Sequence, residues 1–196
     1  MINKIYETIM NYQTDIEQEQ RDKEEMLSFI RRNPDALSRK NLTGHFSASS
    51  WIVNKDHTKV LMVFHNIYKS FSWTGGHNDG EEDFLEVAKK EAREETGIQD
   101  LKLIYDGIFS LESLTVDGHM KNGKYVPSHL HFNLTYLFEA DERDPLTIKA
   151  DENSAVMWIP LNELDKKVNE IWMKQWIYSK LIHKLSKLDM KINSLN

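Results

Sequence analysis

Residues 76–98 read GHNDGEEDFLEVAKKEAREETGI, and the interpretation of the whole chain starts from this stretch. It begins with a glycine and acidic residues, continues through a segment rich in Ala, Leu, Lys, Glu and Arg, and ends on Thr96-Gly97-Ile98. The middle residues are strong helix formers, and glycine is favoured just past a helix end. The pattern therefore predicts a glycine loop followed by a helix from about Phe84 to Thr96.

Three glutamates of this helix, Glu91, Glu94 and Glu95, follow one another at i, i+3 and i+4. Their side chains share one helix face, where like charges repel and destabilise the bare helix. A hard divalent cation relieves that repulsion, because Mg²⁺ and Mn²⁺ prefer oxygen ligands. The alternative is an ordinary solvated acidic face, which is the usual explanation of a charge run. The flanking glycines favour the metal site.

The same stretch resembles the Nudix box, G-x5-E-x7-R-E-U-x-E-E-x-G-U, in which U is a bulky apolar residue. Gly76 and Glu82 occupy its first two fixed positions, and residues 91–98 supply the later glutamates, the glycine and the closing Ile. Two positions depart from the pattern. Lys90 stands where the family has Arg, and the small Ala92 fills the first U position. Lys keeps the charge but lacks the planar fork that binds two carboxylates at once.

The resemblance implies an α+β fold, a Nudix-like α/β/α sandwich with a mixed sheet, extended here by helices at both ends. It also implies a Nudix-type pyrophosphohydrolase that cleaves the diphosphate linkage of a nucleoside diphosphate derivative (NDP-X), with Mg²⁺ or Mn²⁺ as cofactor. Metal ions neutralise phosphate charge and lower the pKa of bound water. The implied catalytic and metal-binding residues are Glu91, Glu94 and Glu95, with the Gly76 carbonyl and Glu82 in support.

Several histidines are further candidates for substrate binding or for the general base. His129 and His131 fall on the polar face of a predicted strand, residues 129–139, and that face is suited to a wet cleft. His77 follows Gly76 and is a candidate for phosphate contact, as is His45. Imidazoles exchange protons near neutral pH. For each histidine an ordinary structural role is the alternative. Three carboxylates are further candidates for the general base: Glu139, Asp141 and Glu142.

The rest of the sequence predicts a strand-rich sheet between helical ends. Residues 1–33 are predicted to be helical, with an apolar stripe that includes Ile2, Ile5, Ile9, Tyr12 and Ile16. The predicted strands are 46–53, 59–65, 101–112, 129–139 and 155–159, with a polar hairpin or flexible loop at 113–127 and a helical tail after Pro160. We expect an N-terminal extension packed on the core (1–41), a Nudix domain (42–160) and a C-terminal helical segment of that domain (161–196).

The composition of the chain limits the kinds of molecule that it can be expected to bind. The net charge of −6 argues against binding to duplex nucleic acid, which requires basic patches. The chain has no Cys, which excludes disulfides and thiolate sites. No apolar run has the length of a membrane helix. We therefore expect a cytoplasmic protein that binds a small nucleoside diphosphate derivative. A homodimer formed through the apolar helices is the lesser alternative to a monomer.

Two other functions are compatible with parts of the pattern. One is a catalytically silent Nudix-fold module that binds nucleotides and regulates, which the three retained glutamates disfavour. The other resembles isopentenyl diphosphate isomerase, whose active site uses a Cys that this chain lacks. No residue in the sequence identifies the group X or the preferred base.

Overall fold

The computed structural model describes residues 2–121 and 123–194, and the chain divides into two compact units. Unit 1 comprises residues 1–49, 75–91 and 105–136, and unit 2 comprises residues 50–74, 92–104 and 137–196. Among the described elements, strands β1 (Gly44–Asn54), β4 (Thr74–His77) and β9 (His129–Ala140) and helix α3 (Phe84–Thr96) pass from one unit into the other.

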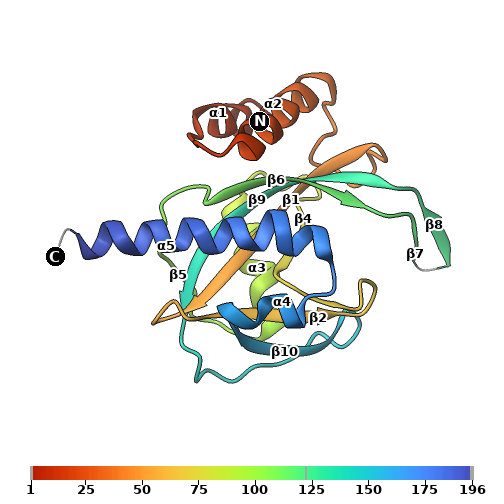
Figure 1. Ribbon diagram of the computed structural model, residues 1–196. Helices are drawn as coiled ribbons and strands as arrows, with labels where there is room; N and C mark the ends of the chain where they lie inside the picture. Colours follow the sequence, from red (N-terminus) through yellow and green to blue (C-terminus); the bar gives the residue numbers. More distant parts are fainter. Residues whose placement is uncertain (1, 122, 195–196) are drawn as a thin grey trace. The chain divides into compact units, whose positions relative to one another are not determined.

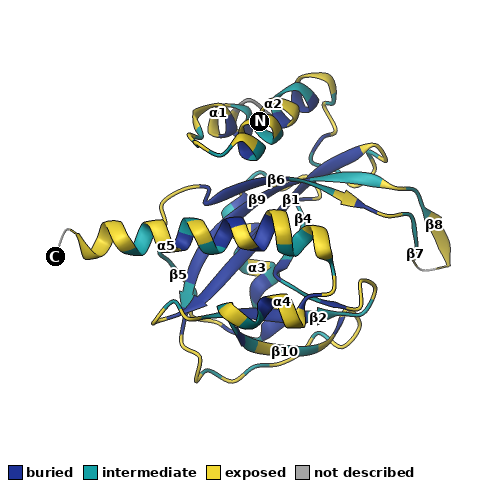
Figure 2. Ribbon diagram, viewed as in Figure 1, coloured by how far each residue is buried: buried dark blue, intermediate teal, exposed yellow. Residues whose placement is uncertain are grey.

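Hydrogen bonds join the strands of the main sheet in the order β10-β2-β1-β9-β5, with β3, β4 and β6 paired to β2, β1 and β9 (Figure 1). The remaining strands of this sheet are β2 (Lys59–His65), β3 (Ser70–Ser72), β5 (Lys102–Leu103), β6 (Ser110–Val116) and β10 (Asn153–Pro160). Strand β1 is buried along its whole length, as its dark blue ribbon in Figure 2 shows. The α+β class, with a mixed sheet and terminal helices, is confirmed.

In unit 1, strand β6 pairs with β9 in a continuous antiparallel register from Ser110↔Thr135 to Val116↔His129. A hairpin of β7 (His119–Lys121) and β8 (Lys124–Val126) extends from the end of this pair (Figure 1). This confirms a hairpin within residues 113–127, although β6 takes up the first part of that stretch. Asn122, in the expected turn, lies outside the described residues.

The N-terminal region forms two helices, α1 (Ile2–Asn11) and α2 (Glu17–Arg32), so the helical prediction for residues 1–33 is confirmed except for a break at residues 12–16. Side chains stabilise the break between them. Tyr12 and Thr14 donate hydrogen bonds to the Glu19 carboxylate at 2.8 and 2.5 Å. Lys23 Nζ donates to the carbonyls of Met10 and Tyr12 at 2.6 and 2.7 Å, which satisfies acceptors at the end of α1.

The apolar stripe nevertheless faces the interior of unit 1. Ile5 and Ile9 are buried, while the side chain of Ile2 is outside the described part of the chain. Helix α2 packs against β6, where the Ser110 hydroxyl donates to Glu19 at 2.6 Å. The amphipathic pattern therefore identified the buried face correctly, although it missed the break.

In unit 2, β10 pairs antiparallel with β2, and β2 pairs with β3. The core contains an aromatic cluster in which the Tyr178 ring stacks on Trp51, with centroids 5.5 Å apart, and meets Trp73 edge-on at 5.6 Å. Trp73 is 7% exposed and is therefore a core residue.

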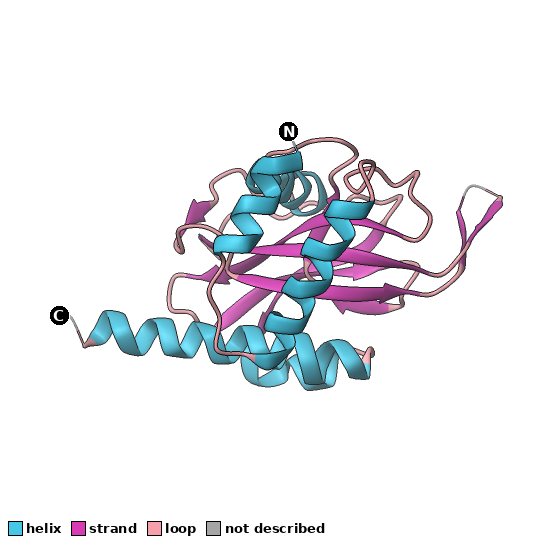
Figure 3. Ribbon diagram, turned by 90° about the horizontal axis from the view of Figure 1, so that it is seen from above, coloured by secondary structure: helices cyan, strands magenta, loops and turns pink. Residues whose placement is uncertain are grey.

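The C-terminal tail of unit 2 is helical but interrupted. A 3-10 turn η1 (Leu161–Glu163) and the short helix α4 (Leu164–Lys167) are followed by a break, a π-helical segment η2 (Met173–Tyr178) and the long helix α5 (Ser179–Asn193) (Figure 3). At the break, Asn169 is bound to the β3 region instead of continuing the helix. Its backbone N–H donates to Ser70 Oγ at 2.9 Å, and its side chain donates to the Lys69 carbonyl at 2.6 Å.

The prediction of one continuous strand over residues 101–112 is wrong. Only Lys102 and Leu103 pair with β9, as β5 in unit 2, and β6 does not begin until Ser110 in unit 1. Between them the chain turns at Gly107, whose φ of +87° is a conformation that suits glycine. Across the described residues, the structure contains no helix with the length and apolar character needed to cross a bilayer.

Candidate functional site

Helix α3 begins at Phe84 and ends at Thr96, as the sequence predicts. In unit 1, the Asp83 carboxylate accepts a hydrogen bond from the backbone N–H of Glu86 at 3.1 Å, which caps the first turn. In unit 2, Gly97 has a φ of +81° and donates its N–H to the Arg93 carbonyl at 2.9 Å, which ends the helix. The continuous helix gives Glu91, Glu94 and Glu95 the spacing of a single helix face.

In unit 1, the backbone of Gly76 lies directly against the side chain of Glu91. A Cβ atom added to Gly76 would come within 2.4 Å of the Glu91 Cδ and 2.6 Å of its Oε1. Any side chain there would displace the carboxylate, so glycine is required by this close approach. The arrangement fits a set of oxygen ligands in which the half-buried Glu91 carboxylate and the Gly76 backbone act together.

In unit 2, the other two glutamates have different surroundings. Glu95 is 5% exposed, and its Oε2 accepts a hydrogen bond from the Asn153 amide at 3.2 Å. Glu94 is exposed, and its Oε2 lies 3.6 Å from the ammonium group of Lys149. One carboxylate is therefore fixed by a buried amide, and the other lies beside a lysine side chain.

The glycine loop before α3 is held by a charge pair in unit 1. Arg39 Nε donates to Asp79 Oδ1 at 2.7 Å, and a second guanidinium nitrogen bonds the other oxygen. This bonding lowers the pKa of the Asp79 carboxyl, chiefly through the side-chain hydrogen bond from Arg39. Glu81 accepts from the backbone N–H groups of Glu82 and Asp83, at 2.8 and 3.0 Å, and the Glu82 side chain is half-buried.

Strands β1, β4 and β9 bring three histidines together in unit 1: His45, His77 and His131. Their ring centroids are 4.8–4.9 Å apart, and one nitrogen from each ring lies within 4.8 Å of the others. His129 adjoins this group, with its Nε2 3.1 Å from Nε2 of His131. The sequence singled out each of these histidines but gave no indication that His45 would join the others, because long stretches of chain separate them.

Hydrogen bonds fix the tautomers of two of these rings. His45 is 3% exposed, and its Nδ1 lies 3.1 Å from the Asn41 carbonyl, so this nitrogen carries the proton. The lone pair is then on Nε2, which is buried and has no hydrogen-bond partner. His129 Nδ1 likewise donates to the Pro127 carbonyl at 2.8 Å, which makes its Nε2 an acceptor for His131.

Burial keeps the clustered imidazoles uncharged at neutral pH. Desolvation lowers the pKa of His131 to about 2, with a further contribution from His77 and the other histidines. Desolvation, followed by the charge of Arg39, lowers the pKa of His77 to about 3. The pKa of His45 is lowered by the same cause, although its hydrogen bond to Asn41 acts in the opposite direction. Neutral imidazoles keep a lone pair that can bind a metal or accept a proton.

A buried polar network continues along β9 from the histidines, and its central residue, Glu112, is not among the residues predicted from the sequence. This side chain is fully buried and accepts hydrogen bonds from Asn133 at 2.9 Å and Thr135 at 2.8 Å. Asn133 in turn accepts from Ser47 and Ser49. The polar face expected to line a wet cleft is thus, at these positions, a buried hydrogen-bond network. The signal in the sequence was a single carboxylate that follows three apolar residues, Ile108, Phe109 and Leu111.

The carboxylates left open as the general base all lie in unit 2 and each is ion-paired. Glu139 pairs with Lys102 at 3.3 Å, Glu142 with Lys59 at 2.8 Å, and Asp141 with Arg143 at 2.9 Å. No observation distinguishes one of them as a base.

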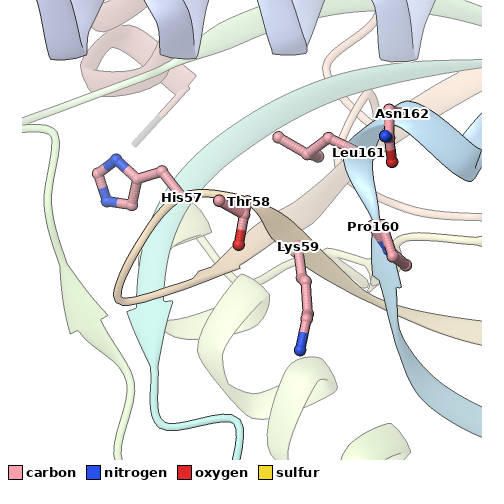
Figure 4. Close-up of a pocket in the computed structure, with 6 residues that line it drawn as sticks. All are labelled: His57, Thr58, Lys59, Pro160, Leu161 and Asn162. Atoms are coloured by element: carbon pink, nitrogen blue, oxygen red, sulfur yellow. The ribbon is translucent and has the colours of Figure 1, made fainter.

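Unit 2 also contains a pocket of 390 Å³ that none of the predicted site residues lines (Figure 4). It lies where the β1–β2 turn meets the end of β10, and its wall consists of His57, Thr58, Lys59, Pro160, Leu161 and Asn162. We assign it no role in the chemistry, because its size is not matched by a convergent set of polar groups.

Comparison with known proteins places this geometry in a family. The NUDIX domain family model matches residues 44–180, which are most of the chain and include the whole of α3. Among curated proteins, no sequence matches this chain.

Solved structures share the fold at low sequence identity. An Ap4A hydrolase from C. elegans, in a binary complex, superposes with a TM-score of 0.54 at 20% identity, over 74% of this chain and 98% of that one. RenU, a Nudix hydrolase from M. smegmatis, gives a TM-score of 0.52 at 13% identity over 76% and 88%. A MutT protein from Methanosarcina mazei Go1 gives 0.51 at 14% over 72% and 95%. The chain therefore belongs to the NUDIX family, and this membership supports the Nudix pyrophosphohydrolase expected from its sequence.

Proposed function

We propose that this protein is a divalent-metal-dependent hydrolase that cleaves the diphosphate linkage of a nucleoside diphosphate derivative. The observation that carries the proposal is the packing of Glu91 on the bare backbone of Gly76, on the helix that also presents Glu94 and Glu95. A solvated acidic helix would have no need for such a glycine. The family of the chain, together with its likeness to an Ap4A hydrolase from C. elegans, supports the same chemistry.

The proposed roles follow from the surroundings of each carboxylate. Glu91, Glu94 and Glu95 supply oxygen ligands, with the Gly76 carbonyl beside Glu91 and Glu82 in support. Bound Mg²⁺ or Mn²⁺ supplies charge neutralisation and acidifies a coordinated water. Asn153 orients Glu95 by its hydrogen bond, and Lys149 offsets the charge of Glu94 when no cation is bound.

The histidines His77, His129 and His131 are the proposed contacts to substrate phosphate. Burial favours the neutral form of His77 and His131. A neutral imidazole has one N–H to donate to a phosphate oxygen: His77 would donate it directly, and His129 and His131 would do so in place of their bonds to the Pro127 carbonyl and to His129. Whether a histidine, a box glutamate or one of the unit 2 carboxylates acts as general base stays a prediction to be tested by pH–rate profiles.

The proposal is tested by incubating the purified protein with dinucleotide polyphosphates, nucleotide sugars, ADP-ribose and oxidised nucleotides, with Mg²⁺ or Mn²⁺, and identifying the products by mass spectrometry. We expect the diphosphate linkage of at least one of these classes of compound to be cleaved, and we expect EDTA to abolish the cleavage. Binding of these compounds without turnover would instead identify the catalytically silent module.

Three further expectations are proposed with this function. The chain is expected to act in the cytoplasm on a small molecule and not on duplex nucleic acid. Its division into 1–41, 42–160 and 161–196 is proposed for the family core and its two helical extensions. A homodimer is proposed through apolar side chains exposed on the C-terminal helical region. These are Ile171, Trp172 and Trp176, with exposures of 64%, 42% and 55%. Light scattering of the wild type and W176A would test the dimer.

A further inference from the structure

We propose that His45, His77 and His131 form a second metal site, for a nitrogen-preferring ion of the Zn²⁺ class, distinct from the oxygen site on α3. All three residues belong to unit 1 and come from separate strands, β1, β4 and β9. The proposal concerns binding alone, so it stands or falls independently of the hydrolase activity.

The first support is convergence. One ring nitrogen from each residue lies within 4.8 Å of the other two. In a tetrahedral zinc site with bonds near 2.05 Å, ligand nitrogens are about 3.3 Å apart. Ring rotations that move each nitrogen inward by about 1 Å would therefore complete the site. Such rotations leave the three strands in place.

The second support is the buried lone pair on His45. Its Nδ1 donates to the Asn41 carbonyl, and its Nε2 is buried without a partner in a residue that is only 3% exposed. A metal-bound histidine typically donates its other N–H to a backbone carbonyl, which fixes the tautomer and aims the free nitrogen at the ion. His45 has this arrangement.

The third support is the remaining ring of the group. His129 Nε2 accepts from Nε2 of His131, because His129 uses its own proton on the Pro127 carbonyl. In neutral His131 this leaves the lone pair on Nδ1, available to an ion. His129 thus acts as an outer support for His131, in the same way that the Asn41 carbonyl supports His45.

The ligand chemistry selects the class of ion. Neutral imidazole suits Zn²⁺, Cu²⁺, Ni²⁺ and Fe²⁺, whereas Mg²⁺ requires oxygen ligands and retains its waters. Three protein ligands leave the fourth position of a tetrahedral ion open to water or to an anion such as phosphate. A purely structural explanation, with three neutral rings packed together, would leave the Nε2 of His45 as a buried unsatisfied acceptor.

The test uses the untagged, EDTA-treated protein in the presence of excess Mg²⁺. We expect one equivalent of Co²⁺ to bind with visible d–d absorption, and Zn²⁺ to displace it in calorimetric titrations. His45→Gln and His131→Gln should weaken Zn²⁺ binding by at least about 100-fold, since even loss of an outer support costs 10- to 100-fold. His183→Gln, at a histidine on α5 in unit 2, should bind as the wild type does.

Two further variants keep the result decisive. His77→Gln, like His131→Gln, changes a half-buried ligand, so it tests the site even if the variant of the buried His45 fails to fold, which circular dichroism would show. Glu94→Gln should leave Zn²⁺ affinity unchanged, since the carboxylates are not part of this site. The proposal is overturned if Zn²⁺ fails to bind in excess Mg²⁺, if it binds equally to the histidine variants, or if Glu94→Gln removes it.

Discussion

Helix α3 and the histidine cluster of unit 1 are the two proposed metal sites, and their side chains are brought together by opposite routes. The glutamates Glu91, Glu94 and Glu95 are neighbours along one helix, carry charge and repel one another. The histidines His45 and His131 come from β1 and β9 and are kept uncharged by desolvation. The two groups also differ in donor atom, oxygen in one and nitrogen in the other.

This difference determines how each group depends on its surroundings. A cluster of like charges is held together by a counter-charge. The activity and stability that depend on the α3 glutamates should therefore change with divalent cations and with the groups that orient each carboxylate. A cluster of buried neutral rings is held together by packing. The stability of the protein should therefore depend on pH, because protonation of a ring forces a charge into the interior. Four measurements test these two halves of the comparison.

The largest effect is expected for Glu95→Gln or Glu94→Gln. Either change removes a charged oxygen ligand from α3, and we expect turnover of any identified substrate to fall by about 100-fold or more, corresponding to several kcal/mol of lost metal-ion catalysis. The matched control is Glu86→Gln on the exposed side of the same helix, which should retain activity. Equal losses in all three variants would mean that the loss reflects the helix and not a metal site.

Gly76→Ala should damage the same site through packing. The added Cβ would occupy space within 2.4 Å of Glu91, and overpacking of this kind costs about 1–3 kcal/mol of stability. We expect a lower midpoint in urea together with weaker Mg²⁺ binding. Glu91→Ala in the Gly76→Ala background should restore the midpoint but not the activity. Full activity in Gly76→Ala alone would contradict the close packing of Glu91 on the Gly76 backbone.

The histidine cluster should make the metal-free protein sensitive to acid. The folded pKa values of His77 (about 3) and His131 (about 2) lie below the ordinary value of 6.5, so the unfolded chain binds more protons in between. Stability is then fully present above about pH 6.5 and falls as the pH decreases, by about 1.4 kcal/mol per pH unit for each histidine, until the folded pKa is reached.

Urea unfolding in EDTA at several pH values measures this slope. His131→Gln removes one of the three histidines whose pKa is lowered and should flatten the dependence by about one proton, whereas His183→Gln should leave it unchanged. An identical slope in His131→Gln would show that folding does not lower the pKa of this ring.

The smallest effect is expected for Asn153→Ala. This change removes the amide that donates to the buried Glu95 carboxylate at 3.2 Å, at a cost of about 0.5–1.5 kcal/mol. Added Mg²⁺ should recover part of that loss, and more than it adds to the wild type, because an ion replaces the missing donor. Ser154→Ala, at the exposed neighbour, is the control. A loss that Mg²⁺ does not reduce would separate Glu95 from the metal site.

Local patterns were sufficient to predict the elements that depend on local interactions. Helix α3 was predicted with its observed bounds, Phe84 to Thr96, because the glycine loop before it, its helix formers and Gly97 all agree. Strand β2 was predicted with its observed bounds, 59–65, since its apolar run is bounded by turn residues. The alternation of polar and apolar residues along β9 also indicated which side chains share a face of the strand.

The errors occur where distant side chains decide the structure. The break after α1 depends on Glu19 and Lys23, which lie on the following helix and bind the connecting residues. The break after α4 depends on Ser70, which binds Asn169 across 99 positions of sequence. The histidine group and the Glu112 network likewise require the registers of β1, β4, β6 and β9. None of these contacts leaves a periodic signal in the sequence.

The aromatic cluster around Tyr178 has a spectroscopic consequence. All five tryptophans of the chain, Trp51, Trp73, Trp158, Trp172 and Trp176, fall within unit 2. Their fluorescence will therefore report the unfolding of that unit alone, while imidazole proton resonances of residues 45, 77, 119, 129 and 131 report unit 1. Coincident transitions from the two signals would establish that the units unfold cooperatively.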